Sequence, residues 1–191
     1  MSSVILAEHI AIISADQTAK IPASVRKMLQ RVTLDAYGLM LSARNTDYIQ
    51  AIQSSCVDHG DTTAFGHGSR FTMQDAVLIN GTAVHGEDFD DTFEGTPVHV
   101  SSVIIPTILA IAEREDLPPD KFIRAMAFGA ELICRLALVA PTAIHRQGFH
   151  PTAILGAFGA SLTASIAYGL DAQQTASALG IVGSMASGII E

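Results

Sequence analysis

The sequence predicts an all-α fold, and three observations carry this prediction. Apolar residues recur at helical spacing along most of the chain, and the strict alternation that marks a half-buried strand hardly appears. Hydrophobic residues make up 49% of the chain, which is ample for a buried core. Charged residues make up only 16%, so the composition shows no sign of disorder. A chain of 191 residues fits one sizeable domain, and we expect residues 1–191 to form it.

Two helices are expected near the N-terminus. Apolar residues from Val4 to Ile12 predict the first, and those from Val25 to Met40 predict the second. Pro22 suits the first turn of the second helix, because the N–H that proline lacks has no partner inside that turn. Two loops should follow, a glycine-rich one from about residue 59 to 71 and another from about residue 86 to 97.

The second half of the chain should contain longer helices. The most apolar stretches, Val100–Ala112 and Ala176–Ile190, are shorter than the roughly 20 residues that cross a bilayer, so we expect two buried helices and no membrane. Between them, the prolines at 118 and 119 or the following aspartate should start a helix that runs to about Val139. Close packing of a later helix is predicted by small residues at helical spacing, which are Gly156, Ala160, Ala164 and Ala167.

Charge and cysteine content exclude several classes of partner. The formal net charge is −8, from 11 Lys and Arg against 19 Asp and Glu, which argues against nucleic acid as a partner. The same charge repels an anionic substrate at long range, so a polycarboxylate would need cationic or N–H groups inside a cleft. Cys56 and Cys134 match no disulfide or metal framework, and residues 1–16 lack the pattern of a secretion signal. We therefore expect a cytoplasmic protein with both cysteines as small core residues.

The densest polar segment lies in the second expected loop. Five carboxylates fall within eight residues, and a histidine stands on each side; the segment contains His85, Glu87, Asp88, Asp90, Asp91, Glu94 and His99. Three interpretations compete: a solvated acidic loop in which Asp91 or Thr92 caps a helix, a metal site, and an acid/base site. The residue order fits neither an EF-hand nor a helical two-histidine zinc motif. Crowding of carboxylates should raise some of their pKa values, which would suit acid/base chemistry.

Two further segments are candidate sites. His150, in the stretch Gly148–Thr152, precedes a long apolar helix, whose positive end should lower the pKa of the imidazole and whose N–H groups could hold a carboxylate. A structural histidine is the competing interpretation. Arg70 follows the glycine-rich loop and could clamp a carboxylate bidentately, unless it is an ordinary surface arginine.

Two ordered motifs carry a family resemblance. The stretch from Asn80 to Thr92, followed by His99 and Ser101, resembles the signature of the MmgE/PrpD family. The stretch from Gly148 through Gly188 resembles the next block of that family.

The resemblance implies a homodimeric enzyme with a large helical domain and a smaller α+β lid domain. The family includes 2-methylcitrate dehydratase, cis-aconitate decarboxylase and iminodisuccinate epimerase, whose reactions share proton movement next to a carboxylate without a metal or organic cofactor. The expected substrate is a small di- or tricarboxylate. The lid domain and the family's active-site lysines would lie beyond Glu191, which falls in an apolar run, so we expect an incomplete helical domain.

Carried over by position, the resemblance assigns roles to four residues, and four more are expected to bind the substrate. The expected catalytic residues are Asp88, Thr92, His99 and His150, with a histidine as the acid/base and no metal. The expected substrate-binding residues are His85, Asp91, Ser101 and Arg70. The leading functional hypothesis is a metal-independent lyase similar to 2-methylcitrate dehydratase. The alternatives are an epimerase, isomerase or decarboxylase on a related acid, or a non-catalytic dimerisation module.

Overall fold

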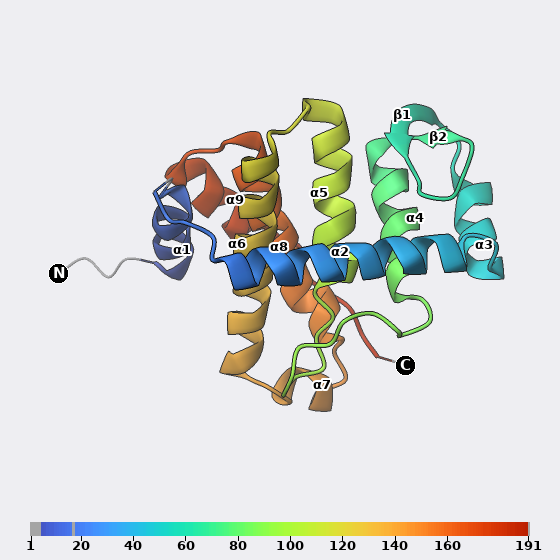
Figure 1. Cartoon of the computed structure of the whole chain (residues 1–191). Coiled ribbons are helices and arrows are strands. Elements are labelled where there is room, and N and C mark those ends of the chain that lie inside the picture. The colour runs from blue at the N-terminus through green and yellow to red at the C-terminus, as the bar shows by residue number, and fades with distance from the viewer. Residues whose placement is uncertain (1–4, 17, 191) are drawn as a thin grey trace.

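Nine helices and one pair of short strands form the regular structure of residues 5–16 and 18–190, which are the residues that the computed structural model describes (Figure 1). The prediction of a mainly helical fold is confirmed. In chain order the elements are α1 (Leu6–Ala15), α2 (Ala23–Ala43), α3 (Asp47–Ser55), β1 (His59–Thr63), β2 (Arg70–Phe71), α4 (Met73–His85), α5 (Ser101–Glu115), α6 (Pro119–Val139), α7 (Ala143–Arg146), α8 (Pro151–Tyr168) and α9 (Ala172–Met185).

Helix α2 lies across α4, α5 and α6, and α8 packs behind them (Figure 1). The core is filled where these helices meet, by fully buried side chains that include Met40, Ile79, Ile104, Ile108, Ile133 and Leu162. Each such side chain contributes about 1.5–3 kcal/mol relative to exposure. This packing fixes the positions of α4, α5 and α8. It therefore also positions the loop between α4 and α5 and the segment that leads into α8.

Glycines let α8 approach its neighbours closely. A Cβ on Gly159 would overlap the side chain of Ile133 on α6, and a Cβ on Gly156 would lie 2.8 Å from Cγ2 of Val103 on α5. The predicted close packing of this small-residue helix is confirmed. It brings the N-terminus of α8 beside α5 and the loop that precedes α5.

The segment from residue 59 to 71, expected as a loop, instead contains a small antiparallel strand pair. Thr63 pairs with Arg70, and the Cα of Gly60 lies so close to the backbone of Phe71 that a side chain would not fit. The buried Asn80 on α4 holds the end of β1 and the turn that follows it. Its Nδ2 donates to the Thr63 carbonyl at 3.0 Å, and its Oδ1 accepts from the Phe65 N–H at 2.9 Å.

The two most apolar stretches differ in burial. Val100–Ala112 lies largely within α5 and is buried as predicted. The stretch 176–190 is not a buried helix, because α9 ends at Met185 and Ile181, Met185 and Ile189 are 62%, 72% and 74% exposed. Apolar composition alone does not show which face a neighbour covers.

Helix α8 alone among the described residues is long and apolar enough to cross a membrane by length and composition. Half of its 18-residue window is buried, and the helix contacts α5, α6 and α9. It therefore packs as the central helix of the domain.

The two cysteines, expected as core residues, are free thiols at the edge of the core, where both are only partly buried. Burial, with a smaller contribution from the charge of Glu131, raises the pKa of Cys134 to about 11. Its thiol is therefore protonated and unreactive near neutral pH.

Candidate active site

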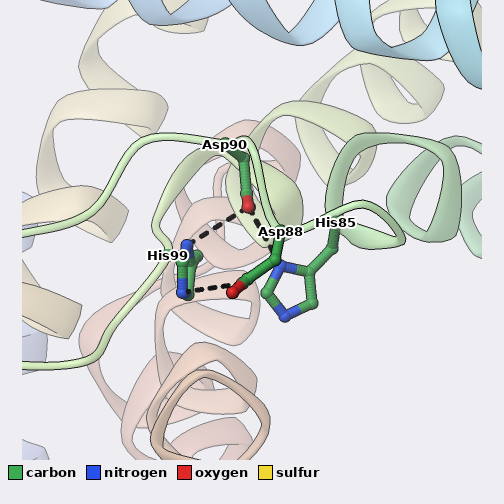
Figure 2. Close-up of side chains that lie close together, drawn as sticks. All are labelled: His85, Asp88, Asp90 and His99. Atoms are coloured by element: carbon green, nitrogen blue, oxygen red, sulfur yellow. Dashed lines mark hydrogen bonds and ion pairs between the residues drawn. The ribbon is translucent and has the colours of Figure 1, made fainter.

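Three segments meet at one end of α4. His85 is the last residue of α4, the loop from Gly86 to Val100 carries Asp88, Asp90 and His99, and His150 stands at the start of α8. Figure 2 shows the first four of these side chains pointing toward one another. Asp88 adopts a left-handed backbone conformation (φ 56°), which aspartate tolerates better than most residues and which turns the loop back toward His99.

Asp90 is the centre of the cluster, because its side chain is fully buried and accepts from two imidazoles. Nδ1 of His85 lies 3.1 Å from each carboxylate oxygen of Asp90. Nδ1 of His99 lies 3.1 Å from Oδ1 of the same residue (Figure 2). A buried carboxylate is costly unless it is paired, and here the two imidazoles supply its partners.

His99 is held on three further sides. Its Nε2 lies 3.4 Å from Oδ1 of the exposed Asp88, and its Nδ1 lies 3.5 Å from Oγ1 of Thr92. Its backbone N–H donates to Oγ1 of Thr152 on α8 at 3.0 Å. The acidic loop is thereby fastened to the first turn of α8.

His150 joins the cluster from α8. Its Nδ1 accepts from the Ala153 N–H at 3.3 Å, so the imidazole caps the helix, and its Nε2 lies 3.3 Å from Nε2 of His85. Its own backbone N–H donates to the Gly188 carbonyl at 3.1 Å. The structure therefore brings the acidic segment and the later imidazole together, although they are far apart in the sequence.

The electrostatics differ from the expectation of raised carboxylate pKa values. Burial alone would raise the pKa of Asp90, but hydrogen bonding to His85 and the charges of His85 and His99 lower it below its usual value. The crowding is relieved because imidazoles stand between the carboxylates. The predicted raised carboxylate is thus not found at Asp90, the buried carboxylate of the segment.

The two imidazoles that face each other have opposite shifts. Hydrogen bonding to Asp90 raises the pKa of His85 against the effect of burial, with the charges of Asp90 and Asp88 acting in the same direction. Burial, followed by the positive charges of His85 and His99, lowers the pKa of His150. The lowered value was predicted from the helix start, but burial is the main cause. His85 is thus the more basic imidazole of the pair, and His150 is the one that more readily stays neutral.

A cavity of about 660 Å³ opens beside this pair, between α4, α5 and α8. His85, His150 and Thr152 are among its lining residues, most of which are apolar or small. His99 and the aspartates of the loop are not among the described residues that line it. A small acid in this cavity would therefore meet His85 and His150 first.

Two of the predicted substrate-binding residues, Arg70 and Asp91, have other partners, and a third, Ser101, is buried away from the cavity. Arg70 pairs with Glu113 at 2.7 Å and lies before the first residue of α4, whereas His85 is the last, so the structure does not bring Arg70 to the cluster. Asp91 accepts from the Ser101 N–H at 3.0 Å and so caps the start of α5, as the solvated-loop interpretation supposed. Ser101 is 2% exposed, its Oγ has no hydrogen-bond partner among the described residues, and it does not line the cavity.

The same cluster contains donors that could hold a metal ion. One donor atom each from His85, Asp88, Asp90 and His99 lie within 4.8 Å of one another, and nitrogen and carboxylate donors suit zinc. The separations of 3.1–3.4 Å between imidazole nitrogens and carboxylate oxygens are those of hydrogen bonds and ion pairs, and donors around one tetrahedral zinc ion would stand at similar separations.

A helical domain that places two imidazoles at a cavity, with a third imidazole and a buried carboxylate behind them, is a candidate acid/base enzyme domain. The family sequence model described as the MmgE/PrpD N-terminal domain matches residues 6–191, so the chain belongs to the MmgE/PrpD family. The resemblance in the two sequence motifs is thereby confirmed.

Curated relatives include decarboxylases. The chain is 25% identical over 181 residues to the cis-aconitate decarboxylase-like protein oryM of Aspergillus oryzae, covering 89% of this chain and 38% of that protein. It is 34% identical over 111 residues to human cis-aconitate decarboxylase, covering 56% and 23%, and 29% identical over 161 residues to the mouse enzyme, covering 80% and 33%. The chain thus matches well under half the length of each relative.

Proposed function

We propose that this chain is the site-bearing helical domain of a metal-independent lyase that moves a proton next to a carboxylate of a small polycarboxylic acid, in the manner of 2-methylcitrate dehydratase. The observation that supports it best is the contact of His85 and His150 at the cavity wall, with the buried Asp90 behind them. General acid/base catalysis needs such a group within hydrogen-bond reach of the moving proton.

The site also offers a way to hold an anion on an acidic chain. Imidazoles supply positive charge when protonated, and the first turn of α8 places backbone N–H groups beside His150. In this proposal Thr92 and the start of α8 bind substrate carboxylates, and Asp88 orients His99. Cations outside residues 1–191 would complete the stabilisation of the enolate-like charge.

Decarboxylation of a related acid is the second candidate, because the relatives are named as cis-aconitate decarboxylases. The same site would then protonate the carbon that loses carbon dioxide, so the two candidates differ in which group leaves. Product analysis by NMR after incubation with 2-methylcitrate, citrate and cis-aconitate separates them.

Binding provides the first test. Calorimetric titration of these acids into the chain should show saturable binding that is lost in His150→Ala and kept in His59→Gln, a matched change of an exposed histidine on β1. A folded chain that binds none of the acids, or binds them equally without His150, would contradict the enzyme proposal and favour a non-catalytic dimerisation module.

Metal independence has its own test. Dialysis against EDTA should change neither acid binding nor the melting temperature, because imidazole protons already pair the carboxylates. Metal analysis of the purified chain accompanies this measurement, and stoichiometric zinc whose removal abolishes binding would contradict the proposal. A homodimer in the cytoplasm is part of the same proposal and is checked by sedimentation equilibrium and cell fractionation.

A further inference from the structure

The hydrogen bonds around His150 define which of its nitrogens carries the proton. Nδ1 accepts from the Ala153 N–H at 3.3 Å, so Nδ1 presents its lone pair to the helix. A neutral imidazole has one protonated nitrogen and one acceptor nitrogen. The proton of neutral His150 therefore lies on Nε2.

The position of the proton on His85 follows from its position on His150. Nε2 of His150 lies 3.3 Å from Nε2 of His85, and two nitrogens can share a hydrogen bond only if one donates and the other accepts. Because His150 donates, Nε2 of His85 accepts and carries no proton. The proton of His85 is then on Nδ1, which faces both oxygens of the buried Asp90 at 3.1 Å. All three hydrogen bonds run in one direction, from the start of α8 to Asp90.

We propose that His85 is the general base of this site and that Asp90 positions it. A carboxylate that accepts from Nδ1 holds an imidazole in the tautomer whose Nε2 is basic, and it stabilises the imidazolium that forms. The inference rests on the proposed function, and it replaces the substrate-binding role that the sequence suggested for His85.

The cavity gives this base access to a substrate. His85 and His150 both line it, and an acid bound there would separate their two Nε2 atoms. His99 does not line the cavity, and its two nitrogens face Asp90 and Asp88. Of the three imidazoles, His85 therefore combines contact to the cavity with a lone pair that becomes available when a bound acid displaces His150.

The proposed step is a proton transfer. The C–H bond next to a substrate carboxylate breaks, its electron pair stays on carbon and spreads into the carboxylate, and the proton forms an N–H bond with Nε2 of His85. The imidazolium is paired with Asp90. His150, released from His85, donates a hydrogen bond from Nε2 to the enolate oxygen and keeps its proton. The reverse step returns the proton to carbon.

Nitrogen-15 NMR of the ring nitrogens in the full chain at pH 8 tests the hydrogen-bond direction without any turnover. We expect Nδ1 of His85 and Nε2 of His150 to be protonated, with His85→Gln used to assign the signals. In Asp90→Asn the preference of His85 for the Nδ1 proton should weaken, because a neutral amide replaces the carboxylate that accepts it. A His85 protonated on Nε2 in the unsubstituted chain, or a ratio of the two tautomers that does not change in Asp90→Asn, overturns the proposal.

Exchange of substrate C–H hydrogens in deuterium oxide, measured with citrate and 2-methylcitrate, tests the base itself. His85→Gln should lower the exchange rate by roughly 10²–10⁴-fold, the usual contribution of a general base, and His59→Gln should not change it. Exchange that persists in His85→Gln overturns the proposal. If the unsubstituted chain shows the expected tautomers and exchanges no hydrogen, the proposed function fails, while the hydrogen-bond chain and the position of Asp90 stand.

Discussion

The two ends of α4 carry polar clusters that differ in burial and in the kind of charge they hold. At the N-terminal end, Arg70 pairs with Glu113 across a partly exposed surface. At the C-terminal end, two imidazoles share the buried Asp90 beside a cavity. The guanidinium charge is permanent, whereas the charge of an imidazole changes near neutral pH. The first cluster can only hold the strand pair in place, while the second can also move a proton.

The largest effect should come from removing the shared acceptor. Asp90→Ala leaves the Nδ1 groups of His85 and His99 without their buried partner, and we expect a loss of about 3 kcal/mol in the free energy of unfolding. Urea denaturation measures it, with Glu113→Gln as the matched change at the other end. Equal losses in the two variants would remove the distinction between the clusters.

The strand pair is held by a buried residue in the middle of α4, and this residue does not titrate. Asn80→Ala removes the hydrogen bonds to the Thr63 carbonyl and the Phe65 N–H, and should cost about 2 kcal/mol. Because an amide carries no charge, this cost should be the same at pH 5.5 and pH 8. A cost that varies with pH would show that the strand pair is coupled to a titrating group.

The cost of Asp90→Asn should depend on pH. Asp90 raises the pKa of His85 above the ordinary histidine value of 6.5, so the stabilisation is fully present below pH 6.5 and is lost as pH rises through the folded-state pKa. The variant should therefore lose more free energy of unfolding, relative to the unsubstituted chain, at pH 5.5 than at pH 8. Paired urea titrations cancel groups common to both proteins, and a difference of the opposite sign would contradict the assignment.

The smallest effect is expected at Arg70. Arg70 and Glu113 are 50% and 32% exposed at their side chains, and such a pair contributes only about 0.2–1 kcal/mol. Arg70→Ala should cost no more than this, and most of the cost should disappear in 1 M salt because of screening. A large loss that salt does not reduce would indicate a buried role for Arg70.

Helices were predictable because their signals are local. The helix from Pro119 to Val139 was placed correctly, because a proline pair starts it and apolar spacing continues through it. The strand pair was missed because β2 has only two residues and therefore shows no alternation. The exposure of α9 was missed because its apolar composition does not show which neighbouring helix covers which of its faces.

Most residues of the candidate site could be predicted from the sequence, but their arrangement in space could not. The family motif located Asp88, Thr92, His99 and His150, and the structure brings these residues together. Asp90 is one of five carboxylates in a loop without periodicity, so only the folded chain shows that it points inward. Arg70 was assigned to the substrate because a free arginine and a paired one look the same in a sequence.

The backbone bonds that join residues 148–150 to residues 188–190 have a consequence for motion. The His150 N–H donates to the Gly188 carbonyl, and the Ile190 N–H donates to the Gly148 carbonyl. These two hydrogen bonds hold the start of α8 against the segment that follows α9, next to the imidazole. Breaking these two hydrogen bonds and displacing His150 are therefore the same local unfolding event. A ligand held by His150 should therefore slow solvent exchange of the Ile190 amide, some forty positions away in sequence, and that amide would report occupancy of the cavity.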